Sequence, residues 1–142
     1  MTNTLAEFIS YAFEKSGAKA DAFDMLLCVP PDKKRYRRRG FDHTEVIGKA
    51  VTEKLGIPYV NKVVFKIKSN LPQHTLRARQ RAENVRGVYK VAKPDAVKGK
   101  NILLIDDVFT TGSTANEVSR ILKKAGAKYV LVATVAKSVP KI

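Results

Sequence analysis

Residues 102–114 read ILLIDDVFTTGST, and this stretch decides how the rest of the chain is interpreted. The apolar run NILLI at 101–105 is typical of a buried strand. Two carboxylates, Asp106 and Asp107, come directly after it, and the hydroxyl-rich run TTGST at 110–114 follows. The stretch therefore predicts a strand, a polar loop and the start of a helix, with both acids just beyond the end of the strand.

Apolar residues elsewhere in the chain alternate between helical and strand-like spacing. Helical spacing occurs at 4–15, 44–55 and 114–125, each soon followed by a glycine. Short apolar or β-branched runs predict strands at 25–30, 60–67, 87–91, 101–105 and 129–136. Apolar strands that alternate with helices are typical of a parallel sheet covered by helices. We therefore predict an α/β fold, a single domain with a parallel β-sheet flanked by helices on both faces.

The length of 142 residues suits one domain rather than two. We divide it into an N-terminal helical segment, 1–24, and a main domain, 25–142. A turn is expected around 93–100. The segment 69–86 is polar and basic without a clear apolar face, so we expect a long loop there. Loops of that length in compact domains usually serve as lids or binding loops.

The charge of the chain favours polyanionic ligands. Lys and Arg number 27 against 13 Asp and Glu, which gives a net charge of +14. Such an excess attracts nucleic acid, polyphosphates or phosphorylated small molecules, although a merely soluble basic surface is the alternative. The basic residues gather in the run KKRYRRR at 33–39 and in a second cluster formed by Arg77, Arg79, Arg81 and Arg86.

Several protein classes are excluded by composition. No apolar run approaches the ~20 residues that a membrane span needs. The N-terminal stretch carries acidic and polar residues, so it does not read as a secretory signal. A single cysteine, Cys28, excludes an internal disulfide and a cysteine-cluster zinc site. We expect a cytoplasmic protein.

The run behind the two acids has the composition of an anion site. In an open parallel sheet, ligands bind beyond the carboxyl ends of strands, where loops lead into helix N-termini. Backbone N–H groups of such a loop suit phosphate, and carboxylates suit the vicinal hydroxyls of a sugar. The residues that supply the hydroxyl groups and the close backbone approach are Thr110, Thr111, Gly112, Ser113 and Thr114. Together they describe a site for a ribose 5-phosphate.

Two other interpretations of this stretch are a nucleotide-hydrolysis motif and a loop cap. An apolar strand that ends in two acids also resembles a Walker B segment, but that assignment needs a GxxxxGK[ST] loop upstream, and none is present. The two acids could instead serve only to cap a loop. The five-residue cup behind them favours a ligand site over both alternatives.

The motif ILLIDDVFTTGST resembles the binding motif for phosphoribosyl pyrophosphate (PRPP) in type I phosphoribosyltransferases. Two further stretches, RRRGFDHTEVIGKAV at 37–51 and LPQHTLRARQRAENVRGVY at 71–89, resemble the ComF-like (competence protein F) branch of that family. The resemblance covers most of 25–136 and implies a type I phosphoribosyltransferase fold. Proteins of this branch usually carry a four-cysteine zinc module, for which this chain has only Cys28.

The resemblance implies roles for individual residues. Asp106 and Asp107 would hold the ribose hydroxyls, and 110–114 would hold the 5′-phosphate. Arg39 and Gly40 match the loop that binds pyrophosphate. Four residues of the segment 69–86 match the flexible lid that closes over PRPP, namely Gln73, Arg77, Arg81 and Asn84.

The implied reaction transfers the 5-phosphoribosyl group and releases pyrophosphate. Positive charge builds on the anomeric carbon, so the catalytic roles go to Asp106 and Asp107, and to Arg81 at the leaving group. Mg²⁺ is expected as a cofactor bound mainly through PRPP, without a dedicated metal site in the protein. His43 is interpreted as a polar residue at a helix start rather than a catalytic base. The acceptor is not predicted, because it would be chosen by a variable hood at 1–24.

Two further function classes stay open. The second class is a protein associated with single-stranded DNA that keeps the PRPP site as a sensor or vestige. The competence-type resemblance implies a link to DNA uptake, and the basic cluster around Tyr36 suits single-stranded DNA. The third possibility is a structural subunit that meets an acidic partner. The predicted partners are PRPP or pyrophosphate and, in the second reading, single-stranded DNA; a homodimer is allowed.

Overall fold

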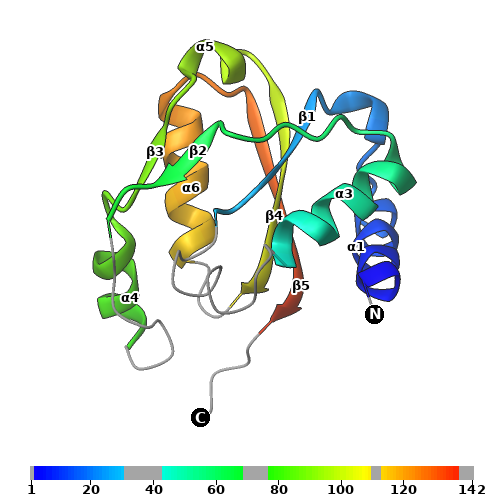
Figure 1. The fold of residues 1–142 in the computed structure, drawn as a ribbon, viewed down its shortest axis with the longest axis horizontal. Coiled ribbons are helices and arrows are strands. Elements are labelled where there is room, and N and C mark those ends of the chain that lie inside the picture. The colour runs from blue at the N-terminus through cyan, green and yellow to red at the C-terminus, as the bar shows by residue number, and fades with distance from the viewer. Residues whose placement is uncertain (1, 31–42, 69–76, 110–112, 138–142) are drawn as a thin grey trace.

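The computed structural model describes residues 2–30, 43–68, 77–109 and 113–137, and Figure 1 shows how their helices and strands are arranged. In chain order, the elements are α1 (Thr2–Lys15), η1 (Ala20–Ala22), β1 (Met25–Cys28), α3 (His43–Leu55), β2 (Val64–Lys66), α4 (Ala78–Val85), β3 (Tyr89–Val91), α5 (Pro94–Val97), β4 (Asn101–Phe109), α6 (Ser113–Lys124) and β5 (Tyr129–Lys137).

The central sheet has three parallel strands in the order β1-β4-β5. In the middle strand β4, Ile102 pairs with Met25 of β1 on one side and with Val130 of β5 on the other. A parallel sheet flanked by helices was predicted from the unbroken apolar runs, and it is confirmed. The strand order was not predicted, because apolar runs alone do not specify which strands are neighbours.

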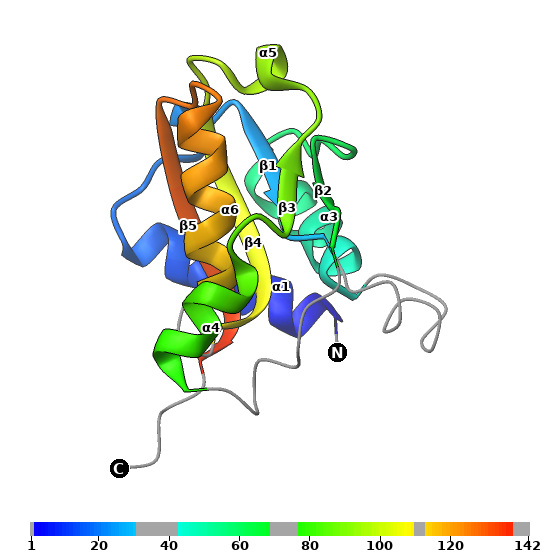
Figure 2. The ribbon, with the colours of Figure 1, turned by 90° about the vertical axis from the view of Figure 1, so that its left-hand side faces the viewer.

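Helices cover both faces of this sheet, as predicted. Helices α1 and α3 lie on one face, where Leu26, Leu103 and Ile105 are buried against them. Helix α6 lies on the opposite face, over Ile102 and Leu104 (Figures 1 and 2). Neighbouring residues of β4 thus serve opposite cores, because successive side chains of a strand point to opposite faces. Burial on both faces explains why the run NILLI contains no polar residue after Asn101.

Strands β2 and β3 form a separate antiparallel pair, in which Val64 faces Val91 and Lys66 faces Tyr89. The alternation of strands and helices in the sequence did not show that these two strands lie outside the parallel sheet. Each strand buries its first residue and exposes its second, a pattern typical of antiparallel strands with one solvated face. A single bridge between Leu26 and Tyr59 connects the chain before β2 to the central sheet.

The expectation of a loop throughout 69–86 is wrong for 78–85, which form α4. The side chain of Gln80 accepts a hydrogen bond from the backbone N–H of Arg77 at 3.1 Å, which stabilises the first turn. Val85 is buried at the other end, and α4 packs against α6. One apolar anchor is too weak a pattern to reveal an eight-residue helix. The predicted turn at 93–100 contains the short helix α5, which begins at a proline.

Candidate functional site

The C-terminal ends of the parallel strands lie at one edge of the sheet, together with the start of α6 and helix α4. Both views show the ends of β4 and β5, the start of α6 and helix α4 at this edge, with α5 at the opposite edge (Figures 1 and 2). This is the edge where open parallel sheets bind ligands.

Asp106 and Asp107 lie within β4 rather than beyond it, so their predicted position is corrected. The strand continues to Phe109 because β5 continues beside it, with Asp106 paired to Thr134 and Phe109 to Lys137. Asp106 is two residues after Leu104 in the same strand, so its side chain lies on the same face, the one covered by α6. It is only 7% exposed. The structure thus places one buried carboxylate on the α6 face of β4, with Asp107 as the next residue of the same strand.

The predicted phosphate cup joins β4 to α6. Thr110, Thr111 and Gly112 lie outside the described residues, while Ser113 and Thr114 are the first two residues of α6. The first N–H groups of a helix have no intrahelical partner and carry a partial positive charge, which favours an anion there. The helix start is therefore where the sequence predicted it, within one residue.

The predicted pyrophosphate residues Arg39 and Gly40 lie outside the described residues, between β1 and α3. The end of β1 and the start of α3 are held together, because the Cys28 thiol donates a hydrogen bond to the Thr44 carbonyl at 3.4 Å. Gly48 allows this close approach, since a Cβ atom there would lie 2.4 Å from Cys28 Sγ. His43 is the first residue of α3, as interpreted from the sequence.

The predicted lid residues fall on and before α4. Gln73 lies outside the described residues, and Arg77 is the exposed residue that precedes the helix. Arg81 and Asn84 are on α4, and Asn84 is half-buried. The three positions 77, 81 and 84 are spaced by four and three residues, so they form one stripe along the helix backbone.

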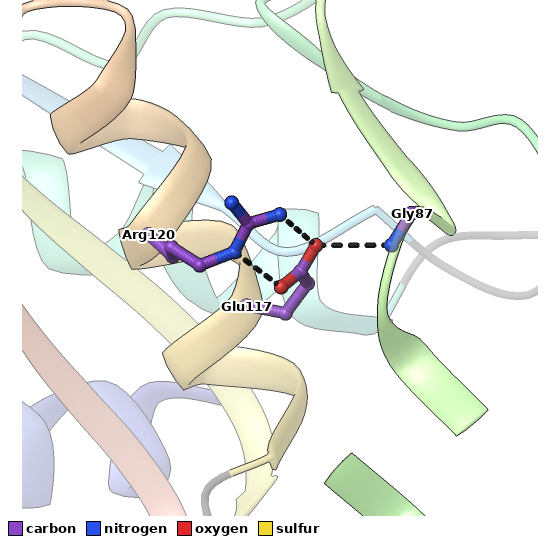
Figure 3. Close-up of polar contacts among 3 residues, drawn as sticks. All are labelled: Gly87, Glu117 and Arg120. Carbon is purple, nitrogen blue, oxygen red and sulfur yellow. Dashed lines mark hydrogen bonds and ion pairs between the residues drawn. The ribbon is translucent and has the colours of Figure 1, made fainter. Parts of the chain in front are cut away.

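Sequence reasoning missed Glu117, an acid of α6 that is buried with 6% of its area exposed. Its carboxylate accepts hydrogen bonds from Arg120 Nε at 2.8 Å, from Arg120 Nη2 at 2.9 Å and from the backbone N–H of Gly87 at 3.1 Å (Figure 3). The available signal was an acid and an arginine three residues apart beside the apolar stripe of a predicted helix.

The pKa of Glu117 is held below its ordinary value of 4.5. The hydrogen bonds from the Arg120 guanidinium are the largest cause, and the Gly87 N–H and the charges of Arg120 and Arg86 act in the same direction. Burial opposes this effect, because it favours the neutral acid. Glu117 is therefore ionised at neutral pH and bound by donors of its own chain.

The described residues at this edge carry few groups that could bind Mg²⁺ directly. Among the residues that the structure describes, no group of three or more His, Cys, Asp and Glu side chains could hold a metal ion. The carboxylate of Asp106 offers hard oxygen atoms of the kind Mg²⁺ prefers, and Mg²⁺ commonly completes its shell with water and substrate phosphates. The residues therefore fit an ion brought in by a phosphorylated substrate. In the same described part of the chain, no helix is both long and apolar enough to span a bilayer.

Comparisons with known proteins agree with this geometry. The phosphoribosyl transferase domain family matches residues 45–140. The DNA utilization protein YhgH of Salmonella typhi is 31% identical over 109 residues, covering 77% of this chain and 47% of that protein. Competence protein F of Haemophilus influenzae is 31% identical over 110 residues, covering 77% and 48% respectively. The chain thus spans about half the length of these curated relatives.

A crystal structure of an adenine phosphoribosyltransferase superposes with a TM-score of 0.59 at 16% identity, covering 96% of this chain and 69% of that one. At such low identity the likeness shows the fold alone, and that fold is the one predicted from the motifs. The resemblance to competence protein F is likewise confirmed by the curated match. The chain therefore belongs to the phosphoribosyl transferase domain family.

Proposed function

We propose that this domain binds PRPP together with Mg²⁺ and transfers the 5-phosphoribosyl group to an acceptor, releasing pyrophosphate. The observation that carries the proposal is the buried carboxylate of Asp106 on the α6 face of β4, in the strand whose C-terminal end leads to the start of α6 at Ser113. A helix N-terminus suits the 5′-phosphate, and adjacent carboxylates suit the ribose diol, so both ends of one ligand find matching groups at this edge.

The proposed roles follow the charge that develops in the reaction. The bond between C1 of the ribose and a pyrophosphate oxygen breaks, the electron pair leaves with pyrophosphate, and C1 bonds to the acceptor, whose proton passes to solvent. Asp106 and Asp107 would stabilise positive charge at C1, and Thr110, Thr111, Gly112, Ser113 and Thr114 would hold the 5′-phosphate. When bound with PRPP, Mg²⁺ supplies neutralisation of the pyrophosphate charge.

The leaving group requires cations. Arg39 and Gly40 would contact pyrophosphate from the segment between β1 and α3, and Arg81 would reach it from α4. Gln73, Arg77 and Asn84 would complete a lid that excludes water during transfer. The lid proposal is supported by the position of α4 beside the N-terminal end of α6 (Figures 1 and 2).

Titration calorimetry with PRPP and Mg²⁺ tests the proposal. The wild type should release heat on binding, and Asp107→Ala should abolish that signal while leaving thermal unfolding unchanged. Asp95→Ala is the matched control, because this exposed acid lies on α5 at the opposite edge of the sheet and should bind PRPP like the wild type (Figure 1). A wild type without binding heat would refute the proposal.

A second candidate function is association with single-stranded DNA in natural competence. It is favoured by the net charge of +14 and by the names of the relatives, a DNA utilization protein and competence protein F. The basic residues would contact the phosphate backbone, so affinity for an oligonucleotide should fall steeply as salt rises. Salt-independent binding would remove the physical basis of this candidate.

The proposal extends to location, acceptor selection and oligomeric state. We place the protein in the cytoplasm, where PRPP would be available to it. We assign the acceptor-selecting hood to residues 1–24, in which α1 exposes Phe8 and Tyr11. A homodimer is compatible with the proposed site, and analytical ultracentrifugation would establish the oligomeric state.

A further inference from the structure

Glu117 is a buried acid that the proposed PRPP chemistry does not use. It lies one turn into α6, the helix whose first residues are proposed to bind the 5′-phosphate. Figure 3 shows its carboxylate between the Arg120 guanidinium of the same helix and the backbone of Gly87. An acid with 6% exposure in this position is costly unless it is fully paired, so its contacts matter.

The contact with Gly87 joins two parts of the proposed site. Gly87 lies between α4 and β3, two residues after the last residue of α4. Its φ of +75° is in the left-handed region that glycine adopts most readily, and its N–H points to Glu117 Oε2 at 3.1 Å. The helix that starts at the phosphate cup is therefore tied directly to the end of the helix that carries Arg81 and Asn84.

The junction is fixed by apolar contacts as well as by this hydrogen bond. Val85 and Val88 are buried on either side of Gly87, and α4 packs against α6. Apolar packing tolerates small rotations of α4. The hydrogen bond from Gly87 to the Glu117 carboxylate specifies a distance and a direction, because two hydrogen bonds from the Arg120 guanidinium hold that carboxylate in place. The bidentate contact from Arg120 fixes the carboxylate, and the carboxylate fixes Gly87.

We propose that Glu117 is a positioning residue for the pyrophosphate half of the site: by holding Gly87, it sets α4 at a defined distance from the start of α6. This inference rests on the proposed function, since it assigns Glu117 a role in placing Arg81 and Asn84 against a ligand bound at α6. Glu117 itself touches no substrate. Its loss should weaken contacts that depend on α4 and spare those made by β4 and the first residues of α6.

Two ligands separate these contacts. PRPP carries the pyrophosphate that α4 is proposed to meet, while ribose 5-phosphate presents only the diol and the 5′-phosphate. For Glu117→Ala, we expect calorimetry to show a loss of PRPP affinity of about tenfold or more, and a change below about twofold for ribose 5-phosphate. A role in general stability alone would lower both affinities by the same factor or neither.

Two variants refine the test. Glu117→Gln keeps an oxygen that can accept from the Gly87 N–H but loses the ion pair, so it should restore most of the PRPP affinity that the alanine variant loses. Arg120→Ala removes the exposed guanidinium that holds the carboxylate, and should give a smaller loss, about threefold, with the same ligand selectivity. If Glu117→Ala fails to fold, Arg120→Ala decides the question.

The control is Asp95→Ala, which removes an exposed acid of α5 at the opposite edge of the sheet. It should bind both ligands like the wild type. A wild type that does not bind PRPP refutes the proposed function. If the wild type binds PRPP, the proposed function stands. The positioning role is then overturned if Glu117→Ala and Arg120→Ala bind PRPP as well as the wild type does, or if they lose affinity for both ligands equally.

Discussion

The central sheet and the β2–α4–β3 unit, residues 64–66, 78–85 and 89–91, are held by different means. In the central sheet, Leu103 and Leu104 are buried on opposite faces, and helices cover both. In the β2–α4–β3 unit, each short strand buries one side only, and Phe65 is 44% exposed. The polar contact between Glu117 and Gly87 ties this unit to α6. Val64, Val88 and Tyr89 bury the inner side of this unit in the same core as Leu104, so the polar contact adds a directed tie to one-sided apolar packing.

The largest expected effect comes from breaking the central layer. Leu104→Ala removes a side chain with no exposed area and leaves a cavity between β4 and α6, so the free energy of unfolding should fall by about 2–5 kcal/mol. Urea denaturation followed by circular dichroism measures this change. A loss below about 1 kcal/mol would mean that the core rearranges to fill the space, contrary to the rigid layer described above.

A smaller effect is expected where α3 meets β1. Gly48→Ala places a methyl group 2.4 Å from Cys28 Sγ, and the resulting overpacking should cost about 1–3 kcal/mol of unfolding free energy. The double variant Gly48→Ala with Cys28→Ala should recover much of this loss, because the sulfur atom is removed. If the stability loss of the double variant equals the sum of the losses of the two single variants, the contact with Cys28 is not the cause of the Gly48→Ala loss.

The polar tie gives a pH-dependent effect. The folded-state pKa of Glu117 lies below its ordinary value of 4.5, so its contribution to stability is fully present above that value and is lost as pH falls through the folded pKa. Between about pH 6 and about pH 3, the wild type should therefore lose more stability than Glu117→Gln. Urea denaturation at both pH values measures the difference, with Glu7→Gln as a control for losing an exposed carboxylate. Parallel losses in the wild type and Glu117→Gln would contradict the assignment.

The smallest effect is expected at the solvated face of β2. Phe65→Ser should change the free energy of unfolding by about 0.5 kcal/mol or less, because the ring is substantially exposed and its strand is short. The same urea denaturation applies. A loss as large as that of Leu104→Ala would show that the outer face of β2 is packed rather than solvated and would remove the contrast between the two regions.

The same contrast explains what could be predicted from the sequence. The runs at 101–105 and 129–136 are apolar because both faces are buried, so strands, parallel pairing and flanking helices followed directly from them. The start of α6 was predicted because hydroxyl residues and glycine precede a clear apolar stripe. The family was predicted because three motifs occur in the expected order.

The remainder depends on contacts that leave little pattern in the sequence. The strand β4 continues through Asp106 to Phe109 because β5 pairs with it there. In the sequence, the two acids after the apolar run instead suggest that the strand ends at 105. Helix α4 buries little apolar surface, so its residues read as a loop. Glu117 and Arg120 have the spacing of a helical pair, but nothing local indicates that Gly87, 30 residues earlier, donates to Glu117.

The central claim is that a phosphoribosyl ligand binds at the C-terminal edge of β4. The most direct test is an NMR titration of the ¹⁵N-labelled protein with PRPP and Mg²⁺, following backbone amides. Amides of Asp106, Thr114 and Gly87 should shift together with one saturating affinity, while Asp95 on α5 at the opposite edge should not move. Shifts confined to other surfaces, or no shifts at saturating PRPP, would contradict the assigned site.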